Sequence, residues 1–84
     1  MAHVTIYTTP FCPYCISAKR LLVKKSVVFE EIDVSSPAIR SVMVERARGG
    51  YTVPQIFIGD RHIGGSDDLH ALEAKGELDR MLQG

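Results

Sequence analysis

The first 34 residues alternate between strand-like and helix-like patterns, and this order constrains the fold more than any other feature of the chain. Residues 3–8 (HVTIYT) and 27–34 (VVFEEIDV) are rich in β-branched and aromatic side chains, as strands are. Between them a helical pattern begins at Pro13, which suits a first helical position because the N–H that it lacks has no partner there. Two strands joined through a helix lie parallel in one sheet, with a right-handed crossover.

The middle of the chain predicts a second helix followed by a hairpin. The helix is expected to begin with Ser36-Pro37 as cap and first turn and to end at Gly49-Gly50. Two short β-rich runs, residues 55–58 and 61–63, then flank Gly59-Asp60, which is typical of a hairpin turn. The apolar positions of the second helix recur at helical spacing: Ile39, Val42, Met43 and Ala47.

The last third of the chain completes the expected architecture. Ser66 is predicted to cap a third helix that directs Leu69 and Leu72 inward and ends at Gly76, before a short terminal helix. The order β-α-β-α-β-β-α predicts an α/β fold with a four-stranded mixed sheet and helices on both faces. With 84 residues, of which 45% are hydrophobic, we expect a single domain over residues 1–84.

Charge and composition narrow the function classes. Ten basic residues balance ten acidic ones, so no net field attracts nucleic acid or anionic lipid. No apolar run approaches the roughly 20 residues of a membrane span, and the first residues lack the pattern of a signal peptide. We therefore expect a cytoplasmic protein, most simply a monomer. In a reducing compartment, two close cysteines are more often catalytic or metal-binding than structural.

The only two cysteines, Cys12 and Cys15, lie where the first helix is expected to begin. Two intervening residues bring their sulfur atoms close enough to form a disulfide without rearranging the backbone. At a helix N-terminus a thiol pKa falls from about 8.5 to about 3.5–7.5. A sulfur that ionises easily also leaves quickly from a mixed disulfide, so Cys12 suits repeated thiol exchange. Cys15, one turn inside the helix, is expected to be more buried and less ionised.

Two other interpretations of the cysteines are weaker. A structural zinc site needs about four ligands, and the three histidines (His3, His62 and His70) have no finger-like spacing around the cysteine pair. A structural disulfide across one helical turn closes a very small loop and stabilises little. We therefore expect no metal site and favour a redox couple.

Three segments together resemble dithiol glutaredoxins, most closely the small bacterial members. These are TTPFCPYC (8–15), TVPQIFI (52–58) and GGSDDL (64–69), in this order and spacing. The resemblance implies a thioredoxin-like fold and glutathione-dependent reduction of protein disulfides and of glutathione–protein mixed disulfides. It implies no bound cofactor, since glutathione is a co-substrate that NADPH and glutathione reductase keep reduced.

The same resemblance assigns roles to residues. Cys12 corresponds to the nucleophile and Cys15 to the resolving cysteine. A cis-proline loop would present the backbone of Val53 to the cysteinyl unit of glutathione as an added strand. The start of the third helix would receive the γ-glutamyl carboxylate on its N–H groups, and Asp67 or Asp68 its ammonium group. The implied glutathione-binding set is Tyr14, Thr52, Val53, Pro54, Gly65, Ser66 and Asp67.

The glycyl carboxylate of glutathione lacks its usual partners in this sequence. Many members of the family have a lysine shortly before the first cysteine, where this chain has Thr9. Some relatives have an arginine or glutamine just before the TVP segment, where this chain has the residues 49–51 (GGY). The candidate contacts for this carboxylate are therefore Thr9, Lys19 and Arg48.

Two further functions stay compatible with the sequence. One is a glutaredoxin-like electron donor that thioredoxin reductase reduces, although the GGSDD segment favours the glutathione-dependent form. The other is an iron–sulfur cluster binder, a dimer in which Cys12 and glutathione ligate the metal. Pro13 and the complete dithiol pair are unlike the members that hold clusters well.

Overall fold

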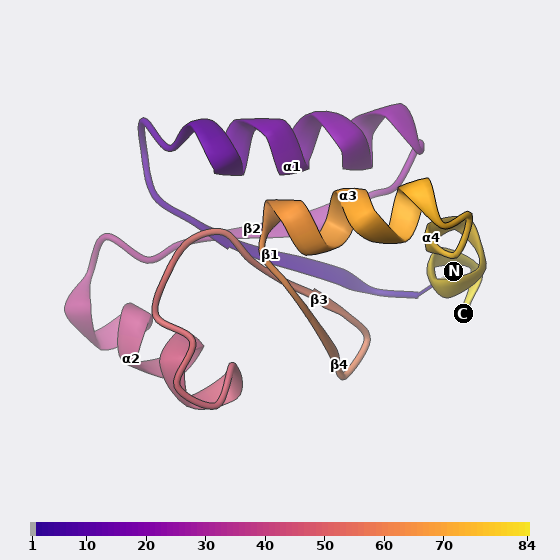
Figure 1. Ribbon diagram of the computed structural model, residues 1–84. Coiled ribbons are helices and arrows are strands. Elements are labelled where there is room, and N and C mark those ends of the chain that lie inside the picture. Colours follow the sequence, from indigo (N-terminus) through magenta and orange to yellow (C-terminus); the bar gives the residue numbers. More distant parts are fainter. Residues whose placement is uncertain (1) are drawn as a thin grey trace.

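A four-stranded sheet in the order β2-β1-β3-β4 forms the centre of the computed structural model, which describes residues 2–84. β1 pairs in parallel with β2 and antiparallel with β3, and β3 pairs antiparallel with β4, which confirms the predicted mixed sheet. The elements follow one another in this chain order (Figure 1): β1 (Val4–Thr8), α1 (Pro13–Lys24), β2 (Phe29–Asp33), α2 (Pro37–Arg46), β3 (Gln55–Ile58), β4 (Arg61–Gly64), α3 (Ser66–Ala74) and α4 (Leu78–Gln83).

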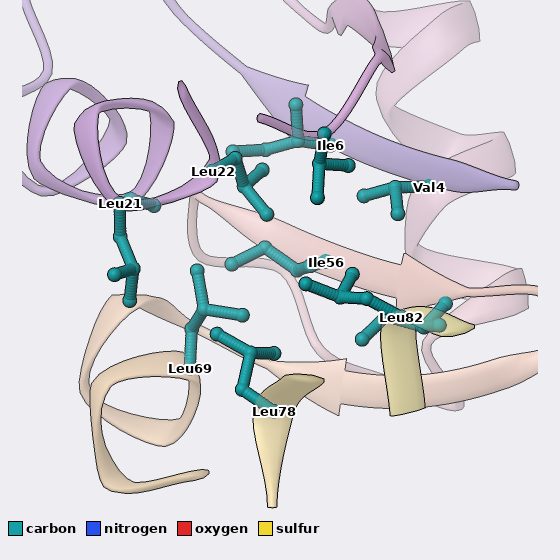
Figure 2. Close-up of a cluster of buried hydrophobic side chains, with 11 residues drawn as sticks. Val4, Ile6, Leu21, Leu22, Ile56, Leu69, Leu78 and Leu82 are labelled. Atoms are coloured by element: carbon teal, nitrogen blue, oxygen red, sulfur yellow. The ribbon is translucent and has the colours of Figure 1, made fainter. Parts of the chain in front are cut away.

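Helices cover both faces of the sheet, as the element order predicts. α1 and α3 lie side by side on one face and α2 lies on the other (Figure 1). On the first face, leucines from α1, α3 and α4 converge on Val4, Ile6 and Ile56 (Figure 2). On the second face, Met43 of α2 belongs to a smaller cluster with Tyr7 and Phe57 of the sheet. Because both faces are covered, every residue of the central strand β1 is buried.

The hairpin prediction is confirmed in detail. Ile58 of β3 pairs with Arg61 of β4, so the loop consists of the two residues Gly59 and Asp60. Gly59 has a φ of +60°, a conformation that glycine adopts without steric cost. The hairpin therefore returns the chain along the edge of the sheet and delivers it directly to the start of α3.

Two details of the helices differ from the sequence prediction. In α2, Ile39 is 43% exposed and Val42 is 59% exposed, because the helix packs on the sheet through Met43 and the residues after it. In α3, Ser66 is the first helical residue, and Gly65 takes the cap position. Gly65 can serve as the cap residue because its backbone N–H donates to the Asp68 carboxylate. This hydrogen bond does not require a side chain on the cap residue.

Candidate active site

Cys12 is the N-cap of α1, at the carboxyl end of β1. Its backbone is extended (φ −101°, ψ 108°), and its Sγ accepts a hydrogen bond from the N–H of Cys15 at 3.2 Å. Both cysteines are free thiols. The sulfur of Cys12 thus lies among the N–H groups and at the positive end of the helix dipole, where a thiolate is stabilised. The predicted position of the two cysteines is confirmed.

Cys15 differs sharply from Cys12 in its surroundings. Its side chain is 1% exposed, as predicted for a residue one turn inside the helix. Burial above all, with the hydrogen bond to Cys12 and the charge of Cys12, raises the pKa of Cys15 to about 11. A backbone hydrogen bond from Thr9 and the charge of Lys19 oppose it. At neutral pH the free protein therefore holds Cys15 as a thiol.

The loop before β3 faces the cysteine pair. The Val53–Pro54 peptide bond is cis, in agreement with the expected cis-proline loop. The Val53 carbonyl oxygen lies 3.9 Å from Cys12 Sγ, although the two residues are 41 positions apart in the chain. Among residues 2–84, nothing accepts a hydrogen bond from the Val53 N–H. The backbone of Val53 is thus available for pairing with an extended peptide beside the sulfur.

A hollow of about 530 Å³ extends from this loop to the start of α3. The hollow runs from the loop 52–54 to residues 64–68, and Tyr14 of α1 also lines it. All the residues of the implied glutathione-binding set therefore line one groove: Tyr14, Thr52, Val53, Pro54, Gly65, Ser66 and Asp67. Gln55 and His62 also line it, and the sequence analysis did not single them out as site residues.

The start of α3 forms the far end of the groove. The N–H groups of Ser66 and Asp67 belong to the first turn, where N–H groups lack helical partners. One oxygen of Asp68 is engaged by the N–H of Gly65 at 3.0 Å. Gly64 has a φ of +113°, and a β-carbon there would collide with the Asp68 carboxylate, so only glycine fits. This end combines free N–H donors with the carboxylate of Asp67.

The geometry agrees with the comparisons with known proteins. Residues 4–63 match the family model of the glutaredoxins. The chain belongs to the glutaredoxin family. It is 54% identical to a glutaredoxin of Pseudomonas aeruginosa over 98% of both chains. As a member of this family it is a glutathione-dependent thiol–disulfide oxidoreductase.

Solved structures support the same fold. The chain superposes on the solution structure of a glutaredoxin from Brucella melitensis with a TM-score of 0.85, at 55% identity, over 98% of this chain and 89% of that one. It superposes on a buckwheat glutaredoxin–glutathione complex with a TM-score of 0.88, at 28% identity, over 98% of this chain and 77% of that one. The predicted thioredoxin-like fold is thereby confirmed.

The candidate cations for the glycyl end of glutathione lie in different surroundings. Lys19 forms an ion pair of 2.9 Å with Glu31, and both line a separate hollow that includes Thr9. Arg48 follows α2 in a left-handed conformation (φ +52°). The sequence analysis missed Arg40, whose Nη2 donates to the carbonyl oxygen of Tyr51 at 2.6 Å, next to the cis-proline loop. No local pattern signals this contact, because it joins α2 to a loop eleven positions later.

Two kinds of feature are absent from residues 2–84. No helix within residues 2–84 is long and apolar enough to cross a bilayer. In the same part of the chain, no three His, Cys, Asp or Glu side chains gather as a site for a metal ion.

Proposed function

We propose that Cys12 is the nucleophile of a glutathione-coupled exchange on protein substrates. Its thiolate attacks the glutathione sulfur of a glutathionylated protein. The substrate S–S bond breaks as the Cys12–glutathione bond forms, and the protein thiolate leaves. A second glutathione thiolate then attacks the glutathione sulfur bound to Cys12, which releases glutathione disulfide and restores the Cys12 thiolate. The observation that carries this proposal is the position of Cys12 Sγ at the start of α1, beside the open backbone of Val53.

We propose that glutathione lies extended along the groove between the cis-proline loop and α3. Its cysteinyl unit would pair with the backbone of Val53, whose carbonyl oxygen lies 3.9 Å from Cys12 Sγ and whose N–H has no acceptor among residues 2–84. Its γ-glutamyl carboxylate would accept the N–H groups of Ser66 and Asp67, while the Asp67 carboxylate would hold its ammonium group. Tyr14 would pack against the tripeptide, with Thr52, Pro54 and Gly65 forming the walls. The buckwheat relative, whose structure is a complex with glutathione, supports this choice of ligand.

We propose that Cys15 resolves the mixed disulfides that form with protein dithiols. Its thiolate would attack Cys12 Sγ, which would close the Cys12–Cys15 disulfide and release the substrate thiolate. Two of the influences that raise the pKa of Cys15 come from Cys12: the hydrogen bond between them and the charge of Cys12. Both disappear when Cys12 Sγ enters a disulfide. Cys15 would therefore become easier to ionise only after the first exchange, when a resolving thiolate is needed.

We propose further that the protein acts as a cytoplasmic monomer and that residues 1–84 work as one domain. A reducing compartment supports turnover because it keeps both thiols and glutathione reduced. Both core clusters pack on the same sheet, which supports a single folding unit. The protein partners would be disulfide-containing or glutathionylated proteins, and the balanced charge gives nucleic acid or a membrane surface no attraction.

An NADPH-coupled assay on a glutathionylated peptide tests the proposed function. We expect turnover with glutathione and glutathione reductase, and none when thioredoxin reductase replaces them. Turnover with thioredoxin reductase alone would instead support the alternative electron donor. A coloured protein after anaerobic purification with iron and sulfide would support the iron–sulfur alternative. Absence of NADPH oxidation with glutathione reductase would contradict the proposal.

The cationic partner of the glycyl carboxylate is testable by substitution. We expect Arg40→Ala to raise the KM for glutathione up to about fivefold, because an exposed charge contact contributes about 0.2–1 kcal/mol. Arg48→Ala is expected to act in the same direction. Lys19→Ala is expected to act least, because Glu31 already holds the ammonium group. Arg80→Ala, an exposed arginine in α4, is the control. Unchanged KM values in all three variants would exclude these candidates.

A further inference from the structure

The side chain of Gln55 connects the cis-proline loop to the sheet. Gln55 is the first residue of β3 and is 5% exposed. Its Nε2 donates to the carbonyl oxygen of Thr52 at 3.0 Å and lies 3.3 Å from Thr52 Oγ1. The loop 52–54 belongs to no helix or strand, so a side chain supplies the hydrogen bond that regular structure would supply elsewhere.

A second contact orients the Gln55 amide. Its Oε1 lies 2.6 Å from His62 Nε2 on β4. Because the amide N–H₂ faces the acceptors of Thr52, the oxygen must accept here, and His62 Nε2 therefore carries a proton. The three residues form a directed chain in which His62 donates to Gln55 and Gln55 donates to Thr52.

The His62 ring is itself fixed in place. It stacks on Phe57 with a centroid distance of 4.8 Å and an interplanar angle of 22°. The guanidinium carbon of Arg46 lies 4.0 Å from the centroid of the same Phe57 ring. Arg46 also donates to the hydroxyl of Tyr7, which is buried in β1. The donor that orients the Gln55 amide is thus anchored to the central strand of the sheet.

We propose that Gln55 and His62 are positioning residues that hold the Thr52–Val53 backbone in the conformation that pairs with the cysteinyl unit of glutathione. This inference rests on the proposed function. Neither residue reaches Cys12, so they act through the loop and leave the reacting sulfur unchanged. A backbone edge that is already ordered loses less entropy when a peptide pairs with it, which lowers the KM. Gln55 also occupies the Thr52 carbonyl oxygen, which leaves that acceptor unavailable to a bound peptide.

A pair of substitutions at His62 separates the hydrogen bond from ring stacking. His62→Phe keeps a ring against Phe57 but removes the donor to Gln55. His62→Gln keeps a donor but removes the ring. We expect His62→Phe to raise the KM for a glutathionylated peptide about two- to fivefold, the size of one neutral hydrogen bond, and His62→Gln to restore most of it. In both variants we expect the kcat and the iodoacetamide alkylation rate of Cys12 to stay at the wild-type level.

Gln55→Met supplies a second, independent measurement. It keeps the length of the side chain and fills the same buried space, but it offers no donor to Thr52. We expect a KM increase of about fivefold or more together with a shifted Val53 amide signal in the NMR spectrum. His3→Phe is the matched control for His62→Phe, because the His3 side chain hydrogen-bonds to the exposed Glu30 side chain, away from the groove.

The outcomes separate this inference from the function on which it rests. If the wild-type protein shows no glutathione-dependent turnover, the proposed function is wrong. If the wild type turns over but His62→Phe and Gln55→Met keep its KM and its Val53 amide signal, only the positioning role is wrong. If both His62 variants melt at a lower temperature and lose kcat to the same extent, the positioning role would also be wrong, because His62 would then only stabilise the fold.

Discussion

Cys12→Ser is expected to reduce turnover of a glutathionylated peptide by roughly a thousandfold or more, because a hydroxyl cannot replace a thiolate as the nucleophile. The substitution is expected to leave the groove intact, since Cys12 is not one of the residues that line it and the serine oxygen can still accept the N–H of Cys15. The NADPH-coupled assay measures the rate. Mass spectrometry after incubation with glutathione disulfide measures the adduct, which we expect on the wild type at Cys12 and not on the variant.

The melting temperature of Cys12→Ser, measured on the same samples, shows whether the variant keeps the wild-type fold. A melting temperature close to that of the wild type would assign the loss to chemistry. Turnover well above the rate without enzyme, or an adduct that still forms after Cys12→Ser, would show that another group carries the reaction. An alkylation rate of Cys12 equal to that of a free cysteine would also contradict the account, because it would remove the effect of the helix N-terminus on the sulfur.

Cys15→Ser is expected to separate two activities that share Cys12. In the proposed mechanism, removal of glutathione from a peptide needs only Cys12 and a second glutathione, so we expect this variant to keep at least part of that activity. Reduction of a protein disulfide by the dithiol route needs attack from within the same molecule. We expect the dithiol rate to fall by about two orders of magnitude, because an intramolecular thiolate has a very high effective concentration. The two rates are compared on two substrates. A disulfide protein such as insulin measures the dithiol route, and a glutathionylated peptide measures the removal of glutathione.

Selective alkylation tests the reason for this division of roles. Because burial and Cys12 raise the pKa of Cys15 to about 11, the thiol form dominates until the pH exceeds the usual range of cysteine ionisation. We expect iodoacetamide at neutral pH to label Cys12 first while the buried Cys15 stays largely unlabelled, and the labelling of Cys15 to increase as the pH rises. Equal labelling of both residues at neutral pH, or a complete loss of both activities in Cys15→Ser, would contradict the proposed roles.

The local parts of the site could be predicted from the sequence because they depend on neighbours along the chain. Pro13 favours a helix start, so the position of Cys12 at the cap and of Cys15 one turn inside follow from spacing alone. The order of strand and helix patterns likewise predicts the parallel pairing of β1 with β2. These features can be predicted from the order of residues along the chain, the helical repeat and the handedness of crossovers alone.

The rest depended on tertiary packing. The contact between Cys12 and Val53 spans 41 positions and arises only when β3 pairs with β1 in the observed register. The hydrogen bonds of Gln55 with His62 require the hairpin and its two-residue turn. The exposure of Val42 depends on how α2 sits on the sheet, because helical periodicity identifies an apolar face without showing how much of it a neighbour covers. The sequence alone therefore determined where each sulfur lies in the first turn of α1. The tertiary structure decided which backbone faces the sulfur of Cys12, because distant segments meet only through the pairing register of the sheet and the packing of the core.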